Sequence, residues 1–172
     1  RDESFRVLAF GSGFFVSTDG LIATNRHVVA GAFYAYATLT DGTKLPVEGI
    51  AALDRHADVA LLKVKGKEFP TLELSETDLP AVGTTVFAIG NPRGLTNTLS
   101  KGLISAHRPV AQDITLLQTT APISAGSSGG PLLLANGRLA GITTATIRGG
   151  QNLNLAVPAV RPSGPDRRPL AC

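Results

Sequence analysis

Short runs of alternating apolar and polar residues recur along the chain, and turn-forming dipeptides such as Asp19-Gly20, Asp41-Gly42 and Asn136-Gly137 separate them. Alternation with a period of two is typical of strands, and nowhere does the 3.6-residue period of an amphipathic helix persist. The dipeptides supply the positive φ that tight hairpins need. The pattern predicts an all-β fold with strands at 6–17, 21–24, 33–39, 44–52, 59–64, 84–89, 98–105, 114–119, 131–135, 138–147 and 152–157.

A connecting segment divides these strands into two groups. Residues 65–82 contain a glycine, two prolines and several charged side chains but few β-branched residues, which is typical of a loop between sheets. We therefore expect two packed six-stranded antiparallel β-barrels, the first within 1–75 and the second within 76–160. Three prolines in 161–172 prevent a regular helix there, so we expect a flexible tail.

Composition places the chain among folded globular domains. Of its 172 residues, 43% are hydrophobic and 17% are charged, which excludes a disordered or acidic-tail protein. A chain of this length buries roughly 70% of the surface that its unfolded form exposes, so a stable core requires no disulfide or metal. The net charge is +3, but three arginines against one aspartate in the last twelve residues carry most of it. No basic stripe crosses the body of the chain, so nucleic acid is not an expected partner.

Cysteine, histidine and leader content exclude further classes. The single cysteine, Cys172, rules out an internal disulfide, and three histidines do not supply a structural zinc site, so we expect no metal and no cofactor. The chain has no Met, no signal-peptide profile and no apolar run of membrane-spanning length. We expect a processed soluble domain without membrane insertion.

The first segment that could carry a reactive group surrounds His27. Its imidazole stands between Arg26 and Val28, where a strand ends at Asn25. A partly buried histidine at the end of an element can act as a general base near neutral pH. The plainer interpretation is a histidine that only hydrogen-bonds at a strand terminus.

The second segment begins with Asp58, whose carboxylate leads directly into the apolar strand at 59–64. An interior carboxylate must be paired or hydrogen-bonded, and an imidazole N–H is a suitable partner that would also fix the tautomer. Asp58 alone could equally cap a turn. Asp54 competes for the role, but Arg55 and His56 after it indicate an exposed loop.

The third segment is Gly126-Ser127-Ser128-Gly129-Gly130. Glycines on both sides allow a sharp turn that brings backbone N–H groups close to a bound carbonyl oxygen. If Ser128 is a nucleophile, the amides of Gly126 and Ser128 would form its oxyanion hole. Alone, the string could be an ordinary Gly/Ser loop. Together the three segments place His27 and Asp58 in the first barrel and Ser128 in the second, so the site would lie in the cleft between barrels.

At these segments the chain resembles the chymotrypsin-like serine proteases, and among them the HtrA/Deg branch, as a protease domain without a PDZ domain. The resemblance runs from Gly11 to Pro158. It is carried by the motifs Gly11-Ser12-Gly13-Phe14, Thr24-Asn25-Arg26-His27-Val28-Val29, Asp58-Val59-Ala60-Leu61, Ile89-Gly90-Asn91-Pro92 and Gly126-Ser127-Ser128-Gly129-Gly130.

The resemblance implies a serine endopeptidase with His27 as general base, Asp58 as orienting acid and Ser128 as nucleophile, working through an acyl-enzyme. It further implies polypeptide substrates, an extracytoplasmic location and a possible trimer, although the long N-terminal loop of many relatives is absent or trimmed. Ser127, directly before the nucleophile, carries no acid. Activation through a salt bridge with a newly cut N-terminus, as in trypsin relatives, is therefore not expected.

In the resembling family the substrate pairs as an extra strand with the segment that corresponds to Thr144-Ala145-Thr146. Ile123 would lie near the pocket floor, where no carboxylate is present to meet Lys or Arg. Thr146, with Ile147 behind it, should narrow the mouth against large aromatic side chains. We therefore hypothesise loose selectivity for cleavage after small or medium aliphatic residues, because one methylene is worth only about 1–3 kcal/mol in such a pocket.

Two other functions compete with this interpretation. The Gly-Ser-Ser-Gly-Gly string also fits the nucleophile elbow of α/β-hydrolases, which would make the protein an esterase. That fold requires a histidine after the nucleophile, whereas His27, His56 and His107 all precede Ser128. The other alternative is a non-catalytic, chaperone-like module that binds extended peptides by strand addition. His56 and His107 are interpreted as loop or surface residues.

Overall fold

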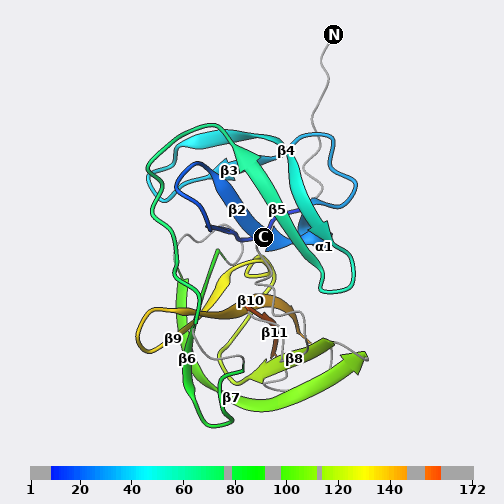
Figure 1. Cartoon of the computed structure of the whole chain (residues 1–172), viewed down its shortest axis with the longest axis vertical. Coiled ribbons are helices and arrows are strands. Elements are labelled where there is room, and N and C mark those ends of the chain that lie inside the picture. The colour runs from blue at the N-terminus through cyan, green and yellow to red at the C-terminus, as the bar shows by residue number, and fades with distance from the viewer. Residues whose placement is uncertain (1–8, 76–78, 92–97, 112–113, 147–153, 160–172) are drawn as a thin grey trace.

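The computed structural model describes residues 9–75, 79–91, 98–111, 114–146 and 154–159. Strands dominate, and they form two sheets that lie one above the other in Figure 1. One short helix, α1 (Arg26–Val29), is present in the described part of the chain. No helix there is long and apolar enough to cross a membrane.

The N-terminal sheet has the antiparallel order β1-β2-β5-β4-β3. Its members are β1 (Phe14–Phe15), β2 (Leu21–Asn25), β3 (Tyr36–Thr38), β4 (Lys44–Asp54) and β5 (Val59–Val64). β4 is the longest of them, and two register shifts against β5 let it curl. The sheet is a curled half-barrel with five described strands, whereas the sequence predicted six strands and closure. The predicted strand at 6–17 appears only as β1, and its first residues lie outside the described part.

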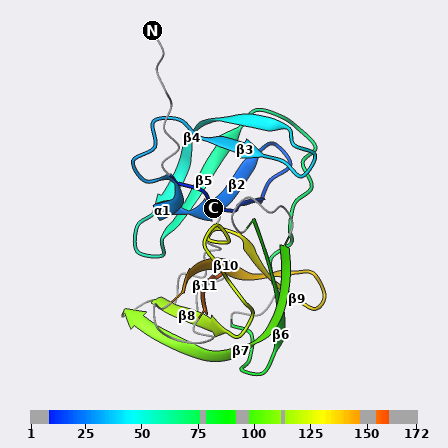
Figure 2. The ribbon, with the colours of Figure 1, turned by 180° about the vertical axis from the view of Figure 1, so that it is seen from behind.

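The C-terminal sheet closes into the predicted six-stranded barrel, with the order β10-β11-β8-β7-β6-β9. Figure 2 shows this barrel from behind, below the N-terminal sheet. Its strands are β6 (Thr85–Gly90), β7 (Thr98–Ala111), β8 (Ile114–Thr119), β9 (Pro131–Leu134), β10 (Leu139–Thr146) and β11 (Asn154–Pro158). The predicted tail at 161–172 lies outside the described residues.

Strand β7 is longer than predicted. It continues to Ala111 because β8 pairs with it along its second half, across two bulges. His107 therefore belongs to a strand and is half-buried, with its Nε2 atom 2.8 Å from the carbonyl oxygen of Pro80. The prediction of a loop or surface position for His107 was wrong in that respect, whereas His56 is exposed in a turn.

Three apolar clusters stabilise the described part of the fold: one in the barrel, one between the sheets and one in the N-terminal sheet around Ile22, Leu62 and Val64. The barrel interior contains Val86, Ile104, Leu117 and Leu132, all fully buried. Burying each such side chain stabilises the fold by about 1.5–3 kcal/mol. A second cluster joins the two sheets, with Ala23, Val59 and Leu61 from the N-terminal sheet against Ile142 and Val157 from the barrel. The second cluster fixes the ends of β2 and β5 against β10.

The β1–β2 hairpin is closed by a polar contact far from this junction. Ser17 accepts a hydrogen bond from the N–H of Leu21 at 3.0 Å and donates to the Asp19 carboxylate. Lys63 from β5 binds the same carboxylate at 2.8 Å. The hydrogen bond from Lys63 is the main cause that lowers the pKa of Asp19 below its ordinary value, and Ser17 adds to it.

Candidate active site

Asp58 lies at the end of the tight turn that connects β4 to β5. The Asp54 carboxylate accepts the N–H groups of His56 and Ala57, each at 2.9 Å, and so closes the turn. Asp58 itself adopts φ +56°, a left-handed conformation that is uncommon outside glycine. Such strain costs on the order of 1–3 kcal/mol and is concentrated at functional sites. Asp54 therefore shapes the turn, and Asp58 presents its carboxylate to α1.

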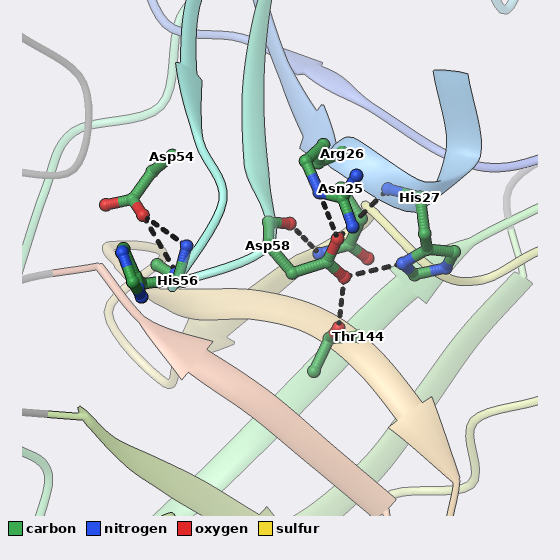
Figure 3. A network of polar contacts seen from close by, with 8 residues as sticks. Asn25, Arg26, His27, Asp54, His56, Asp58 and Thr144 are labelled. Atoms are coloured by element: carbon green, nitrogen blue, oxygen red, sulfur yellow. Dashed lines mark hydrogen bonds and ion pairs between the residues drawn. The ribbon is translucent and has the colours of Figure 1, made fainter. Parts of the chain in front are cut away.

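His27 contacts that carboxylate through two of its nitrogen atoms, as Figure 3 shows. Its backbone N–H donates to Asp58 Oδ1 at 3.0 Å, and its Nδ1 lies 2.5 Å from Asp58 Oδ2. A carboxylate partner favours the tautomer with the proton on Nδ1, and in that tautomer Nε2 is the acceptor nitrogen. About half of the imidazole is exposed, at 46%. The predicted partnership of His27 and Asp58 is present.

Asn25 and Arg26 hold the backbone of this pair. The Asn25 side-chain amide and the Arg26 backbone N–H both donate to the carbonyl oxygen of Asp58, at 3.1 and 3.0 Å. Asn25 is fully buried, and the Arg26 guanidinium lies 3.9 Å from Asp58 Oδ1. The sequence pattern indicated no role for either residue. The available signal was a polar residue at the end of a buried strand, which must find a hydrogen-bonding partner.

Thr144 enters the site because β10 bulges there. Thr143 pairs with Ala156 and Ala145 pairs with Leu155, so Thr144 is the extra residue that has no partner in the ladder. Its hydroxyl donates to Asp58 Oδ2 at 3.2 Å. Its carbonyl oxygen accepts the Ser128 hydroxyl at 2.8 Å. From the sequence, Thr144 was expected only in substrate binding, and neither contact was predicted.

Ser128 is therefore connected to His27 through a chain of three hydrogen bonds that passes through Thr144 and Asp58. The described hydrogen bonds include none between the Ser128 hydroxyl and the imidazole. In this structure the hydroxyl is directed to the Thr144 carbonyl instead. Asp58 and His27 thus form a directly bonded pair, and Ser128 is connected to them only through Thr144.

The loop that carries Ser128 has the tight backbone predicted from its glycines. Gly126 and Gly129 adopt φ +95° and +89°. The carbonyl of Ser127 accepts hydrogen bonds from the Thr143 hydroxyl at 2.7 Å and the Gly130 N–H at 3.0 Å. Within the described residues, no hydrogen bond uses the N–H of Gly126 or of Ser128. Neither amide therefore has a described hydrogen-bond acceptor.

The other predicted site residues lie partly in the barrel core, partly in β10 and partly outside the described residues. Ile123 is buried in the barrel core. Ala145 and Thr146 lie in β10, opposite Leu155 and Asn154 of β11. Ile147 lies outside the described residues. Among the residues that the structure describes, no three His, Cys, Asp or Glu side chains gather to bind a metal ion.

A model of the trypsin-like peptidase domain matches residues 11–142. The chain belongs to the trypsin-like peptidase family. Relatives of this trypsin-like peptidase include the serine protease HhoB of Synechocystis sp., 41% identical over 156 residues, which cover 86% of the chain and 37% of HhoB. A periplasmic DegP-like serine endoprotease of Pseudomonas putida (strain W619) is 39% identical over 163 residues, with 91% and 34% covered.

Solved structures agree with these relatives. The serine endoprotease from Yersinia pestis superposes with a TM-score of 0.81 at 32% identity, covering 91% of this trypsin-like peptidase and 56% of that chain. The HtrA-type protease AlgW, solved with a decapeptide, gives a TM-score of 0.81 at 35% identity, covering 87% and 48%. The expected resemblance to the HtrA/Deg proteases is confirmed. The chain spans about a third of the length of the curated relatives it matches.

Proposed function

We propose that the protein is a serine endopeptidase that cleaves extended polypeptides through an acyl-enzyme. The observation that supports this most directly is the His27–Asp58 pair at 2.5 Å, which Thr144 bridges to the Ser128 hydroxyl. Family membership supports the same reaction. No metal or cofactor is required for it, because an imidazole and backbone amides supply the base and the electrophilic stabilisation.

The proposed cycle begins with a rotation of the Ser128 side chain from the Thr144 carbonyl towards His27 Nε2. His27 takes the hydroxyl proton as Oγ attacks the peptide carbonyl, and the N–H groups of Gly126 and Ser128 bind the resulting oxyanion. His27 then returns the proton to the leaving amine. Water, activated by the same imidazole, hydrolyses the ester and restores Ser128. Asp58 keeps the proton on Nδ1 throughout.

Substrate is proposed to bind along β10. On one side β10 pairs with β11 as far as Thr146, but on the other side it pairs with β9 only as far as Ile142. Within the described residues, the β9 side of Thr144–Thr146 therefore has no strand partner. An extended peptide can add a strand at such an edge. The polypeptide would then run past Ser128, which hydrogen-bonds to Thr144.

A fluorophosphonate probe tests this function because it reacts only with an activated serine. We expect covalent labelling of the wild-type protein, no labelling of Ser128→Ala, and digestion of casein by the wild type alone. Mass spectrometry of the labelled protein should place the adduct on Ser128. Absence of labelling in folded wild-type protein, or an adduct on another residue in its place, would contradict the proposal.

Cleavage is proposed to follow small or medium aliphatic residues. Neither Pro122 nor Ile123, the residues expected near the pocket floor, carries an acid that could meet a basic side chain. In a peptide library digested by the wild type, we expect Val, Ala, Ile and Leu all to occur before the cleaved bond, because selectivity in an aliphatic pocket is loose. A profile dominated by Lys, Arg or Phe would show that this assignment is wrong.

A non-catalytic peptide-binding module remains the second candidate. The observation in its favour is the hydrogen bond of the Ser128 hydroxyl to Thr144 rather than to His27. Such a module would bind unfolded polypeptides, and Ser128→Ala would bind them equally well. Binding without probe labelling or digestion would favour the module over the endopeptidase.

A further inference from the structure

Ser12 uses every one of its polar groups, and most of them reach the other sheet. Its hydroxyl donates to the carbonyl oxygen of Gly126 at 2.7 Å and accepts the N–H of Asn91 at 2.9 Å. Its backbone N–H donates to the carbonyl oxygen of Ser128 at 2.8 Å. Its own carbonyl accepts the Thr24 hydroxyl at 2.7 Å. Ser12 thus links the start of the N-terminal sheet to the loop that carries the nucleophile.

The two carbonyl groups that Ser12 holds flank the proposed oxyanion hole. Each peptide unit is planar, so fixing a carbonyl oxygen also fixes the N–H of the following residue. Ser12 holds the units that follow Gly126 and Ser128. The unit between them is held through the Ser127 carbonyl by Thr143 and Gly130. The unit that follows Gly126 is also held from its other side, because the N–H of Ser127 donates to the carbonyl oxygen of Ser124 at 2.9 Å. The N–H of Gly126 belongs to the preceding unit, which makes no described hydrogen bond. Its direction therefore follows, through φ and ψ of Gly126, from the unit that Ser12 and Ser124 hold.

The space around this link is tight on both sides. A Cβ on Gly11 would lie 3.1 Å from the Ser128 carbonyl oxygen and within 2.4 Å of the Val28 side chain. A Cβ on Gly90 would lie 2.7 Å from the Ser127 hydroxyl oxygen. The glycines beside Ser12 and Asn91 therefore allow these two residues to approach the loop that carries Ser128. At that distance the Ser12 hydroxyl bonds to both the Asn91 N–H and the Gly126 carbonyl.

We infer that Ser12 is a positioning residue for the oxyanion hole: through its hydroxyl it holds the Gly126 carbonyl so that the Gly126 N–H faces the substrate oxygen. The inference rests on the proposed function, because it needs Ser128 to be the nucleophile. It assigns a catalytic consequence to a residue that does not touch the substrate. Ser12 acts on the transition state through Gly126, while substrate binding along β10 does not involve it.

The test compares Ser12→Ala with Ser17→Ala in the same protein. Ser17 is a matched control, because it is also half-buried and its hydroxyl also accepts from a backbone N–H and donates to an oxygen, but it lies in the β1–β2 turn. Losing an oxyanion donor outright lowers kcat by about 100- to 1000-fold, so a misdirected donor should cost less, about 10- to 100-fold. We expect that loss in kcat for Ser12→Ala, with KM changed less than about threefold, and no loss for Ser17→Ala.

A second readout separates positioning from general damage. A peptide aldehyde forms a hemiacetal with Ser128 and uses the oxyanion hole, whereas the product peptide acid binds without forming that adduct. For Ser12→Ala we expect aldehyde affinity to fall by the same factor as kcat, with product affinity unchanged. Ser12→Thr, which keeps the hydroxyl, should recover most of the loss, and Ser12→Cys, a weaker donor of similar shape, should lie between.

Each alternative outcome has a distinct meaning. If Ser12→Ala keeps full kcat and aldehyde affinity, the positioning role is wrong while the proposed function stands. Equal losses in aldehyde and product affinity would also overturn it, since they indicate a purely structural role. If Ser12→Ala does not fold, Ser12→Cys decides by the same aldehyde-to-product comparison. A wild type that is neither labelled nor active overturns the proposed function and this inference together.

Discussion

Asp58→Asn should lower kcat by roughly four powers of ten, the general loss when the orienting acid of a serine protease triad becomes an amide. In the structure, Asp58 Oδ2 accepts the Nδ1 proton of His27 at 2.5 Å and the Thr144 hydroxyl at 3.2 Å. An asparagine there can keep Oδ1 towards the His27 backbone N–H, which places its NH₂ group against Nδ1. The ring must then carry its proton on Nε2.

In that tautomer His27 can no longer act as the proposed general base, while the fold of the protein is expected to be unchanged. A proton on Nε2 leaves no lone pair for the Ser128 hydroxyl, so proton transfer at the start of the cycle is blocked. KM should change little because Asp58 touches the β10 edge only through the Thr144 hydroxyl, whereas strand addition uses backbone groups. The measurement is steady-state kinetics on a cleavable peptide, with circular dichroism and thermal unfolding to verify that the variant is folded.

Asp54→Asn provides the matched control from the same turn. Asp54 accepts the N–H groups of His56 and Ala57 through one oxygen, Oδ1, which an asparagine can retain. We expect its kcat to stay within about twofold of wild type. If Asp54→Asn lost as much activity as Asp58→Asn, the assignment of Asp58 as the orienting acid would be contradicted.

Sequence patterns were sufficient for the strands and for the family. Alternation and turn dipeptides located β5 and β8 with their observed bounds, because both strands are set by local apolar runs. The length of β7 was not visible in the same way. Its second half, around His107, is a strand because β8 pairs with it across bulges, and pairing between segments is not written in local periodicity.

The site shows the same division between local and long-range information. The His27 and Asp58 segments each carried a local signal, and their contact follows from the pairing of β2 with β5. The roles of Thr144 and Ser12 depend on a bulge and on contacts between sheets. A single sequence holds no record of which hydroxyl meets which carbonyl across such a distance. The side-chain rotamer of Ser128 cannot be predicted from the sequence either, because it depends on which nearby acceptor the hydroxyl bonds to after rotation about χ1.

Gly129→Ala should destabilise the protein more than other single changes in the loop and remove most of its activity. Gly129 adopts φ +89°, and a Cβ there would lie 2.2 Å from the Ser12 carbonyl oxygen and 2.3 Å from the Thr24 hydroxyl oxygen. The backbone strain costs about 1–3 kcal/mol, and relieving the overlap costs about as much again. Against a total stability of about 5–15 kcal/mol, we expect Tm to fall by roughly 10 °C or more.

Gly137→Ala separates the two contributions to that loss. Gly137 has nearly the same backbone conformation, with φ +82°, but a Cβ there would have no neighbour within 4 Å. Its free energy of unfolding, measured in urea, should therefore fall only by the strain contribution, with activity retained. Equal losses in the two variants would show that crowding at Gly129 is unimportant. A larger loss at Gly129 would mean that close contact between the loop that carries Ser128 and residues 12 and 24 excludes a side chain, since the backbone cost is common to both sites.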